Sequence, residues 1–120
     1  MRDDMIMAAL NDLNGSSADI EASAVISTDG LVISAILPQN MDEDRVGAMA
    51  AAMLSLGDRT ASELGRGDLE QVLIKGSQGY VLMVAAGDDT VVSVVTKASA
   101  KLGLIFLDVK RSAETIGKLI

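Results

Sequence analysis

Two short acidic runs are the segments of this chain whose side chains could bind a cation or transfer a proton. Asp42, Glu43 and Asp44 offer the carboxylate oxygens that hard cations prefer. The run lacks the glycine and the distant glutamate of a calcium loop, and acidic residues ahead of a helical stretch are typical of helix capping. Asp88 and Asp89 offer a carboxylate pair for acid–base work, but they follow a glycine in a predicted turn, where aspartate is common. We therefore predict no metal site and no catalytic residues in either run.

Two glycine-flanked segments have the composition of loops that bind phosphate. They are Gly65 to Gly67 and Gly76 to Gly79. Neither has the G-x-x-x-x-G-K-[ST] spacing, and neither lies between a strand and a helix. The nucleophile motif G-x-S-x-G is also missing from the sequence. Both segments are predicted to be turns, and the chain is not predicted to hydrolyse nucleotides.

The sequence contains neither cysteine nor histidine. These residues are the commonest nucleophiles, general bases and transition-metal ligands in proteins. Their absence excludes disulfides, thiol chemistry and zinc sites built on Cys or His. We therefore expect a non-catalytic protein that needs no cofactor and no metal.

The charge and hydropathy of the chain limit the classes of partner that it can bind and the cellular location that we expect for it. The net charge of −7 opposes contact with phosphate backbones and with anionic membrane surfaces. Aromatic residues make up only 2% of the chain, so few side chains could stack on bases. No window reaches the roughly 18 apolar residues of a spanning helix, and the charged first residues do not resemble a signal peptide. We expect one domain over residues 1–120 that is cytoplasmic and binds neither nucleic acid nor membrane.

Hydrophobic patterning predicts the element order α-β-β-α-β-β-β-α. Ile20 to Ser27 alternates with the period of a half-buried strand, and Asp29-Gly30 after it is a strong hairpin signal. Helices are predicted over residues 3–13, 42–64 and 101–120, and strands over 20–27, 31–37, 69–75, 80–86 and 90–96. The last two strands are apolar on both faces and should be covered on both. The predicted fold is α+β, a five-stranded antiparallel sheet with one long helix on one face and two helices on the other.

The long helix carries two stripes of residues. The inner stripe, predicted to face the sheet, is Val46, Met49, Ala50, Met53, Gly57, Ala61 and Leu64. The second stripe is made of small side chains at Ala48, Ala51, Ala52 and Ser55, and Arg59 and Ser62 extend it. A helix that packs only on its own sheet should carry large charged groups on its outer face. Either another molecule covers this stripe, or it reflects the high helix propensity of alanine.

Three segments of the chain resemble the roadblock / dynein light chain family, in particular bacterial members related to a gliding regulator. They are the strand–Asp-Gly–strand segment Val25 to Ser34, the segment Gly79 to Val84, and Leu102 to Ile105 ahead of Lys110 and Arg111. The resemblance covers nearly the whole chain. It implies a profilin-like sheet and a homodimer in which the long helices pack side by side. It also implies that the third strands pair across the dimer axis into one ten-stranded sheet.

Two sets of site residues follow for such a dimer. Small size and a position opposite the inner stripe predict a partner-binding surface at Ala48, Ala52, Ser55, Arg59 and Ser62. The dimer interface is predicted at Ala51, Leu54, Asp58, Leu69, Gln71, Leu73 and Lys75. The resemblance implies that the partner is a Ras-like small GTPase, whose hydrolysis could be modulated through its own switch regions. A nucleotide-independent adaptor of a motor or signalling complex, and a small-molecule sensor, are the alternatives.

Overall fold

A computed structural model of the protein describes residues 1–120, and its eight elements follow the predicted order. They are α1 (Arg2–Gly15), β1 (Ile20–Ser27), β2 (Val32–Ile36), α2 (Glu43–Glu63), β3 (Gln71–Gly76), β4 (Gly79–Ala85), β5 (Thr90–Lys97) and α3 (Leu102–Gly117). The predicted α+β class is confirmed. None of the three helices is both long and apolar enough to cross a lipid bilayer.

The five strands form one antiparallel sheet in the order β2-β1-β5-β4-β3. β5 lies at the centre because its side chains are apolar on both faces and need cover on both. Val92 and Val94 are buried on the side of α1 and α3, whereas Val91 is buried on the side of α2. The last strand of the chain therefore joins the β1–β2 hairpin to the β3–β4 hairpin.

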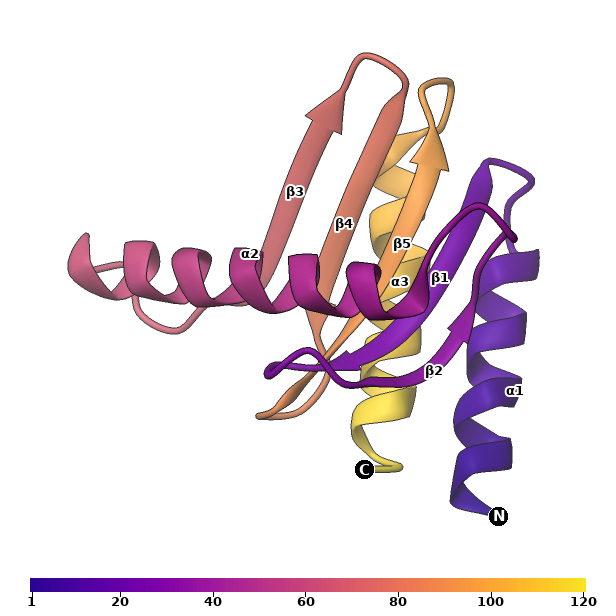
Figure 1. Ribbon diagram of the computed structural model, residues 1–120, viewed down its shortest axis with the longest axis horizontal. Helices are drawn as coiled ribbons and strands as arrows, with labels where there is room; N and C mark the ends of the chain where they lie inside the picture. Colours follow the sequence, from indigo (N-terminus) through magenta and orange to yellow (C-terminus); the bar gives the residue numbers. More distant parts are fainter.

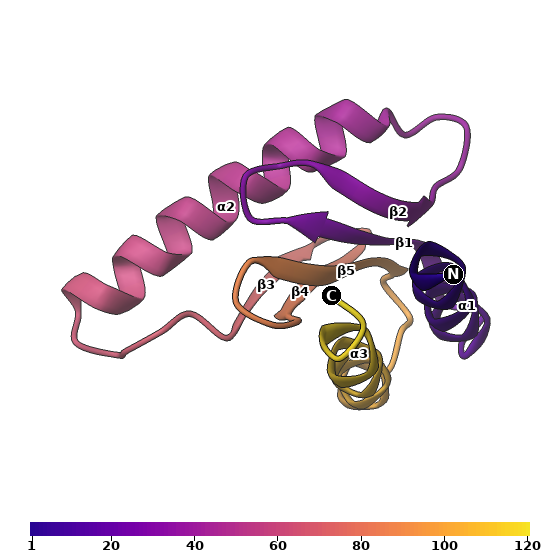
Figure 2. The same cartoon turned by 90° about the horizontal axis from the view of Figure 1, so that it is seen from below.

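The helices lie on the two faces of the sheet as predicted, with α2 on one face and α1 and α3 on the other (Figure 2). The core under α1 and α3 contains 15 buried residues, among them Ile6, Val109 and Ile116. The core under α2 contains only six, among them Ala50 and Leu54. The α2 layer therefore buries much less apolar surface within the chain than the opposite layer does.

The start of α2 shows why the first acidic run is structural. Asp42 is the N-cap, and its carboxylate accepts a hydrogen bond from the backbone N–H of Asp44 at 3.2 Å. Glu43 and Asp44 occupy the first turn, where negative charge interacts favourably with the helix dipole. No group of three acidic side chains converges anywhere in the structure as a metal site would require. The run therefore caps a helix, as its position predicted.

The inner stripe of α2 differs from the predicted one. The buried residues of the helix are Gly47, Ala50 and Leu54, whereas Met49 and Leu64 are 55% and 68% exposed. The helix crosses the strands, and Gly57 still lies against Val72 of β3, but the last turns of the helix extend past that strand (Figure 1). Leu54, predicted to lie in a dimer interface, is only 7% exposed and belongs to the core under α2.

The path of α2 is set where its first turns touch the β1–β2 hairpin. Gly30, in the hairpin turn, has a φ of 96°, which L side chains rarely adopt. A Cβ on Gly30 would lie 3.1 Å from the carbonyl oxygen of Gly47, and a Cβ on Gly47 would overlap the carbonyl oxygen of Gly30. Two glycines thus allow the backbones of a turn and a helix to meet without side chains between them.

We expect Gly47→Ala to lower the free energy of unfolding by about 1–3 kcal/mol, because overpacking a tight contact typically costs that much. Gly103→Ala is the matched control, since Gly103 is also helical and no atom lies within 4 Å of an added Cβ. That change should stabilise the protein by up to about 1 kcal/mol through helix propensity. Urea unfolding at one fixed protein concentration measures both, and equal effects would contradict the role given to the Gly30–Gly47 contact.

Candidate functional site

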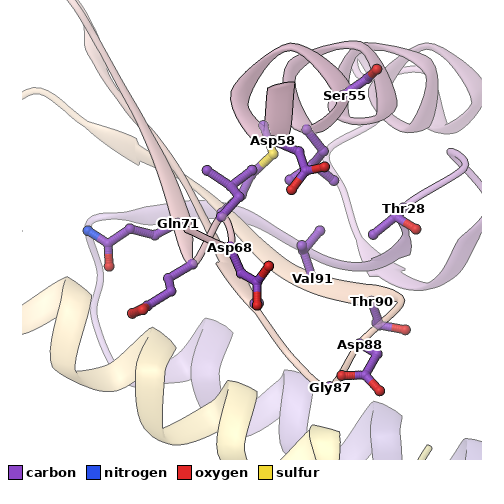
Figure 3. A pocket seen from close by; sticks show the side chains of 14 residues that line it. Thr28, Ser55, Asp58, Asp68, Gln71, Gly87, Asp88, Thr90 and Val91 are labelled. Atoms are coloured by element: carbon purple, nitrogen blue, oxygen red, sulfur yellow. The ribbon is translucent and has the colours of Figure 1, made fainter. Parts of the chain in front are cut away.

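The outward face of α2 forms a ridge of small side chains. Its members are the five residues of the predicted partner-binding surface, all exposed: Ala48, Ala52, Ser55, Arg59 and Ser62. Ser55 points away from the sheet (Figure 3). The one large group, Arg59, pairs with Glu63 at 3.1 Å, and both side chains are mostly exposed, so this ion pair adds little stability. The α2 ridge therefore lets another protein approach the helix backbone closely.

One flank of α2 is apolar and at least partly exposed, which the sequence pattern did not predict. Met49, Met53 and Leu56 follow each other at spacings of four and three residues, and Leu56 is 61% exposed. We call these three residues the apolar flank. Met53 is partly buried against the core under α2, as predicted. Met49, also predicted to face the sheet, is 55% exposed. When a helix crosses the strands at a steep angle, part of its apolar stripe faces along the sheet surface and does not pack on it.

The sheet beside the apolar flank is also uncovered. Ile74 pairs with Val81, and Val81 pairs with Val95, so these three side chains run across β3, β4 and β5 on the face of α2. Ile74 is 38% exposed, and the other two are partly exposed. They line a shallow hollow of about 500 Å³ toward the β3–β4 turn. The apolar flank and this half of the sheet form one continuous apolar surface.

The outer edge of β3 is open. The strand pairs with β4 only and contains no proline, so its other edge presents unpaired backbone groups. Gln71, Leu73 and Lys75, predicted to lie in the dimer interface, are exposed on this edge strand. Leu69 precedes the strand, and a Cβ on Gly57 would lie 3.1 Å from its Cδ2 atom. Leu69 is therefore packed beneath α2 of its own chain.

On the other side of α2, a cleft of about 470 Å³ separates the helix from the β3, β4 and β5 ends. Asp58, Asp68, Glu70 and Asp88 line it, and no lysine or arginine does. The carboxylate of Asp58 points into the cleft (Figure 3). Asp58 and Ala51, which lies against Gly30, were both predicted to contact a second subunit. The structure places them on the side of α2 that faces away from the apolar flank.

The ridge, the apolar flank and the open strand edge are surfaces suited to contact with other proteins. The fold itself is a helix–sheet domain of the α+β class. A family model for the Roadblock/LC7 domain matches residues 8–96, and the chain belongs to this family. The resemblance seen in the sequence is thereby confirmed.

Known proteins of similar length match this chain in sequence or in fold. The uncharacterized protein MJ1340 of Methanocaldococcus jannaschii is 45% identical over 113 residues, which cover 94% of this chain and 95% of that protein. The gliding protein MglB from Thermus thermophilus has a TM-score of 0.90 at 17% identity, covering 98% of this chain and 90% of that one. An MglB with a tetrameric arrangement has a TM-score of 0.91 at 18% identity, covering 98% and 89%. The sequence relative is archaeal, whereas the resemblance in the sequence pointed to bacterial members.

Proposed function

We propose that this domain is a non-catalytic, cytoplasmic homodimer that binds a Ras-like small GTPase through the outer ridges of its two α2 helices. The observation that carries the proposal is the overhang of α2 beyond β3 (Figure 1). Ala61 and Leu64 continue the inward stripe of the helix, yet no strand of the same chain lies beneath its end, and Leu64 is 68% exposed. A helix that presents apolar groups beyond its own sheet needs a second surface to cover them.

A second copy of the chain, related by a two-fold axis, would supply that surface. Antiparallel pairing of two β3 edges places a two-fold axis between the two strands, perpendicular to the sheet. The overhang of each α2 then lies over the uncovered half of the partner's sheet, where Ile74 and Val81 are exposed or partly exposed. The same rotation brings the apolar flanks of the two helices together. The tetrameric arrangement of one MglB with the same fold also supports self-association.

This geometry revises the interface that the sequence predicted. The proposed interface contains the apolar flank, Met49, Met53 and Leu56. It no longer contains Ala51, Leu54 and Asp58, which do not lie on that side of the helix. Gln71, Leu73 and Lys75 stay in the proposed interface as residues of the paired edge. The small side chains of the ridge are left free for a further partner.

The ridge and the cleft beside it together suit a GTPase surface. Small side chains at Ala48, Ala52 and Ser55 allow mobile switch loops to approach the helix closely. The carboxylates of Asp58 and Asp68 in the adjacent cleft attract basic side chains and speed association. The one arginine of the ridge, Arg59, lies in an exposed ion pair with Glu63 at 3.1 Å. We infer that the dimer acts by selecting a conformation of the GTPase switches.

The dimer is tested by Leu56→Asp. Each charge would be buried in the apolar contact between helices, so the dimer dissociation constant should rise at least about a hundredfold, or about 3 kcal/mol. Ser55→Asp is the control, one residue away but on the ridge, and it should leave the dimer intact. Sedimentation equilibrium should give twice the chain mass of 12.4 kDa for the unmodified protein and for the control. A monomeric unmodified protein at tens of micromolar would exclude the proposed dimer.

The GTPase surface is tested by Ser55→Arg. A long charged side chain on the ridge should weaken binding of a Ras-like GTPase from the same genome by at least about tenfold, or about 1.4 kcal/mol. Thr115→Arg, an exposed position on α3, is the matched control and should bind normally. Calorimetry compares the GTPase loaded with GDP and with a non-hydrolysable GTP analogue. Unchanged affinity of Ser55→Arg rules out the ridge, and binding that ignores the nucleotide favours the adaptor alternative.

A further inference from the structure

The two ends of β3 carry opposite charges. Glu70 precedes the strand, Lys75 lies near its end, and both side chains are exposed. Neither residue forms an ion pair within its own chain, and the Nζ atom of Lys75 lies 5.9 Å from the centre of the Tyr80 ring. In the proposed dimer the second β3 runs in the opposite direction. Each charged end of the strand therefore meets the oppositely charged end of the second copy.

A groove beside the start of β3 is negatively charged. It has a volume of about 360 Å³ and lies between β3, β4 and α3. Its charged lining residues are Glu70, Glu114 and Lys110, so two carboxylates face one ammonium group. Glu114 is four residues from Lys110 and from Lys118, yet it forms an ion pair with neither. The groove can therefore accept one further basic side chain, which its own chain does not supply.

Each side chain of β3 belongs to one of the two faces of the sheet. Leu73 points to the face of α3, because it pairs with Leu82, which is buried in the core under α1 and α3. By the alternation of a strand, Gln71 and Lys75 point to the same face. Val72 packs on the core under α2 and so points to the other face. Opposite residues of paired strands share a face, so the two-fold axis must pass between one residue and its own copy.

One position of the axis matches similar side chains along the whole edge. With the axis at Leu73, the two Leu73 side chains, each 46% exposed in the single chain, cover one another. Val72 then lies opposite Ile74 of the second copy, and Gln71 lies opposite Lys75 of the second copy. An axis one residue away in either direction would place a charged side chain opposite an apolar one. The sequence of the strand therefore favours the axis at Leu73.

This register brings Lys75 of the second copy to the groove, because Gln71 lines the groove and points to the same face of the sheet. We propose that the Lys75 side chain of each copy enters the groove of the other and pairs there with Glu70 and Glu114. The inference rests on the proposed dimer and deepens it, since two symmetric contacts fix the register and determine which chains can pair. A suitable second chain carries a basic residue at position 75 and acidic residues at positions 70 and 114.

The charge match acts on specificity more than on affinity. An ion pair between exposed side chains adds little binding free energy. A chain with the wrong charges, however, would place like charges face to face in both grooves at once, which is a strong means of excluding a partner. The apolar contacts between the α2 helices supply the affinity of the proposed dimer, whereas these charges select the chain that is bound.

The test uses two variants with complementary charges. Lys75→Glu places three carboxylates together in each groove, and the double change Glu70→Lys with Glu114→Lys places three basic groups there beside Lys110. In sedimentation equilibrium each variant alone should raise the dimer dissociation constant at least about tenfold, or about 1.4 kcal/mol. Mixed in equal amounts, the two variants should form a heterodimer in native mass spectrometry, because both contacts are restored with one of them reversed. Lys101→Glu, exposed and outside the groove, is the control and should change the dissociation constant by less than about twofold.

The register is tested by cross-linking, since the chain contains no cysteine. Opposite residues of an antiparallel pair have Cα atoms about 4.5–5.5 Å apart, a distance that a disulfide spans. Mild oxidation of Leu73→Cys should therefore give mostly covalent dimer on a non-reducing gel. Gln71→Cys is the control, because its own copy lies four residues away along the edge, or about 13 Å, and it should stay uncross-linked.

The outcomes separate this inference from the proposed dimer. An unmodified protein that is monomeric by sedimentation overturns both. A dimer whose dissociation constant is unchanged by Lys75→Glu, or variants that form no heterodimer when mixed, overturn the charge match and leave the dimer standing. Cross-linking through Gln71→Cys in place of Leu73→Cys overturns the register and, with it, the entry of Lys75 into the groove.

Discussion

The contact between the backbones of Gly30 and Gly47 determines where α2 can lie, because no side chain separates the hairpin from the helix. Once the first turns of α2 are held at the hairpin, the direction of the helix carries it across β5, β4 and β3 and beyond the sheet (Figure 1). The overhang and the sideways apolar flank both follow from this path. A small shift at one end of a 21-residue helix would move its other end by several ångströms.

The two faces of the sheet differ in how much apolar surface their helices bury. The large core under α1 and α3 stabilises the sheet, whereas the small core under α2 leaves much of that helix and of the neighbouring strands exposed. The surfaces that remain apolar without cover lie on both sides of β3, the strand whose edge is unpaired. The edge strand thus concentrates the interaction surfaces that we propose, while the opposite edge, β2, belongs to the hairpin that positions α2.

Sequence patterning predicted the fold well because its signals are local. Alternation identified β1 over Ile20–Ser27 with both ends correct, and acidic residues identified the start of α2 with its N-cap at Asp42. The differences concern α2, where Leu54 is buried and Met49 and Leu64 are exposed. Periodicity gives the side of a helix that is apolar, but the crossing angle decides which part of that side meets the sheet. That angle depends on Gly30 and Gly47, which are far apart in the sequence.

The central position of β5 has a consequence for how the chain acquires its structure. β1 and β2 form one hairpin and β3 and β4 another, but no hydrogen bonds join the two hairpins directly. Residues 90–97 provide the link, and they pair with residues 20–27 across most of the length of the chain. Such distant pairing carries a large loop-closure entropy and slows folding. On the ribosome, the sheet therefore stays in two separate pieces until residues 90–97 have been synthesised.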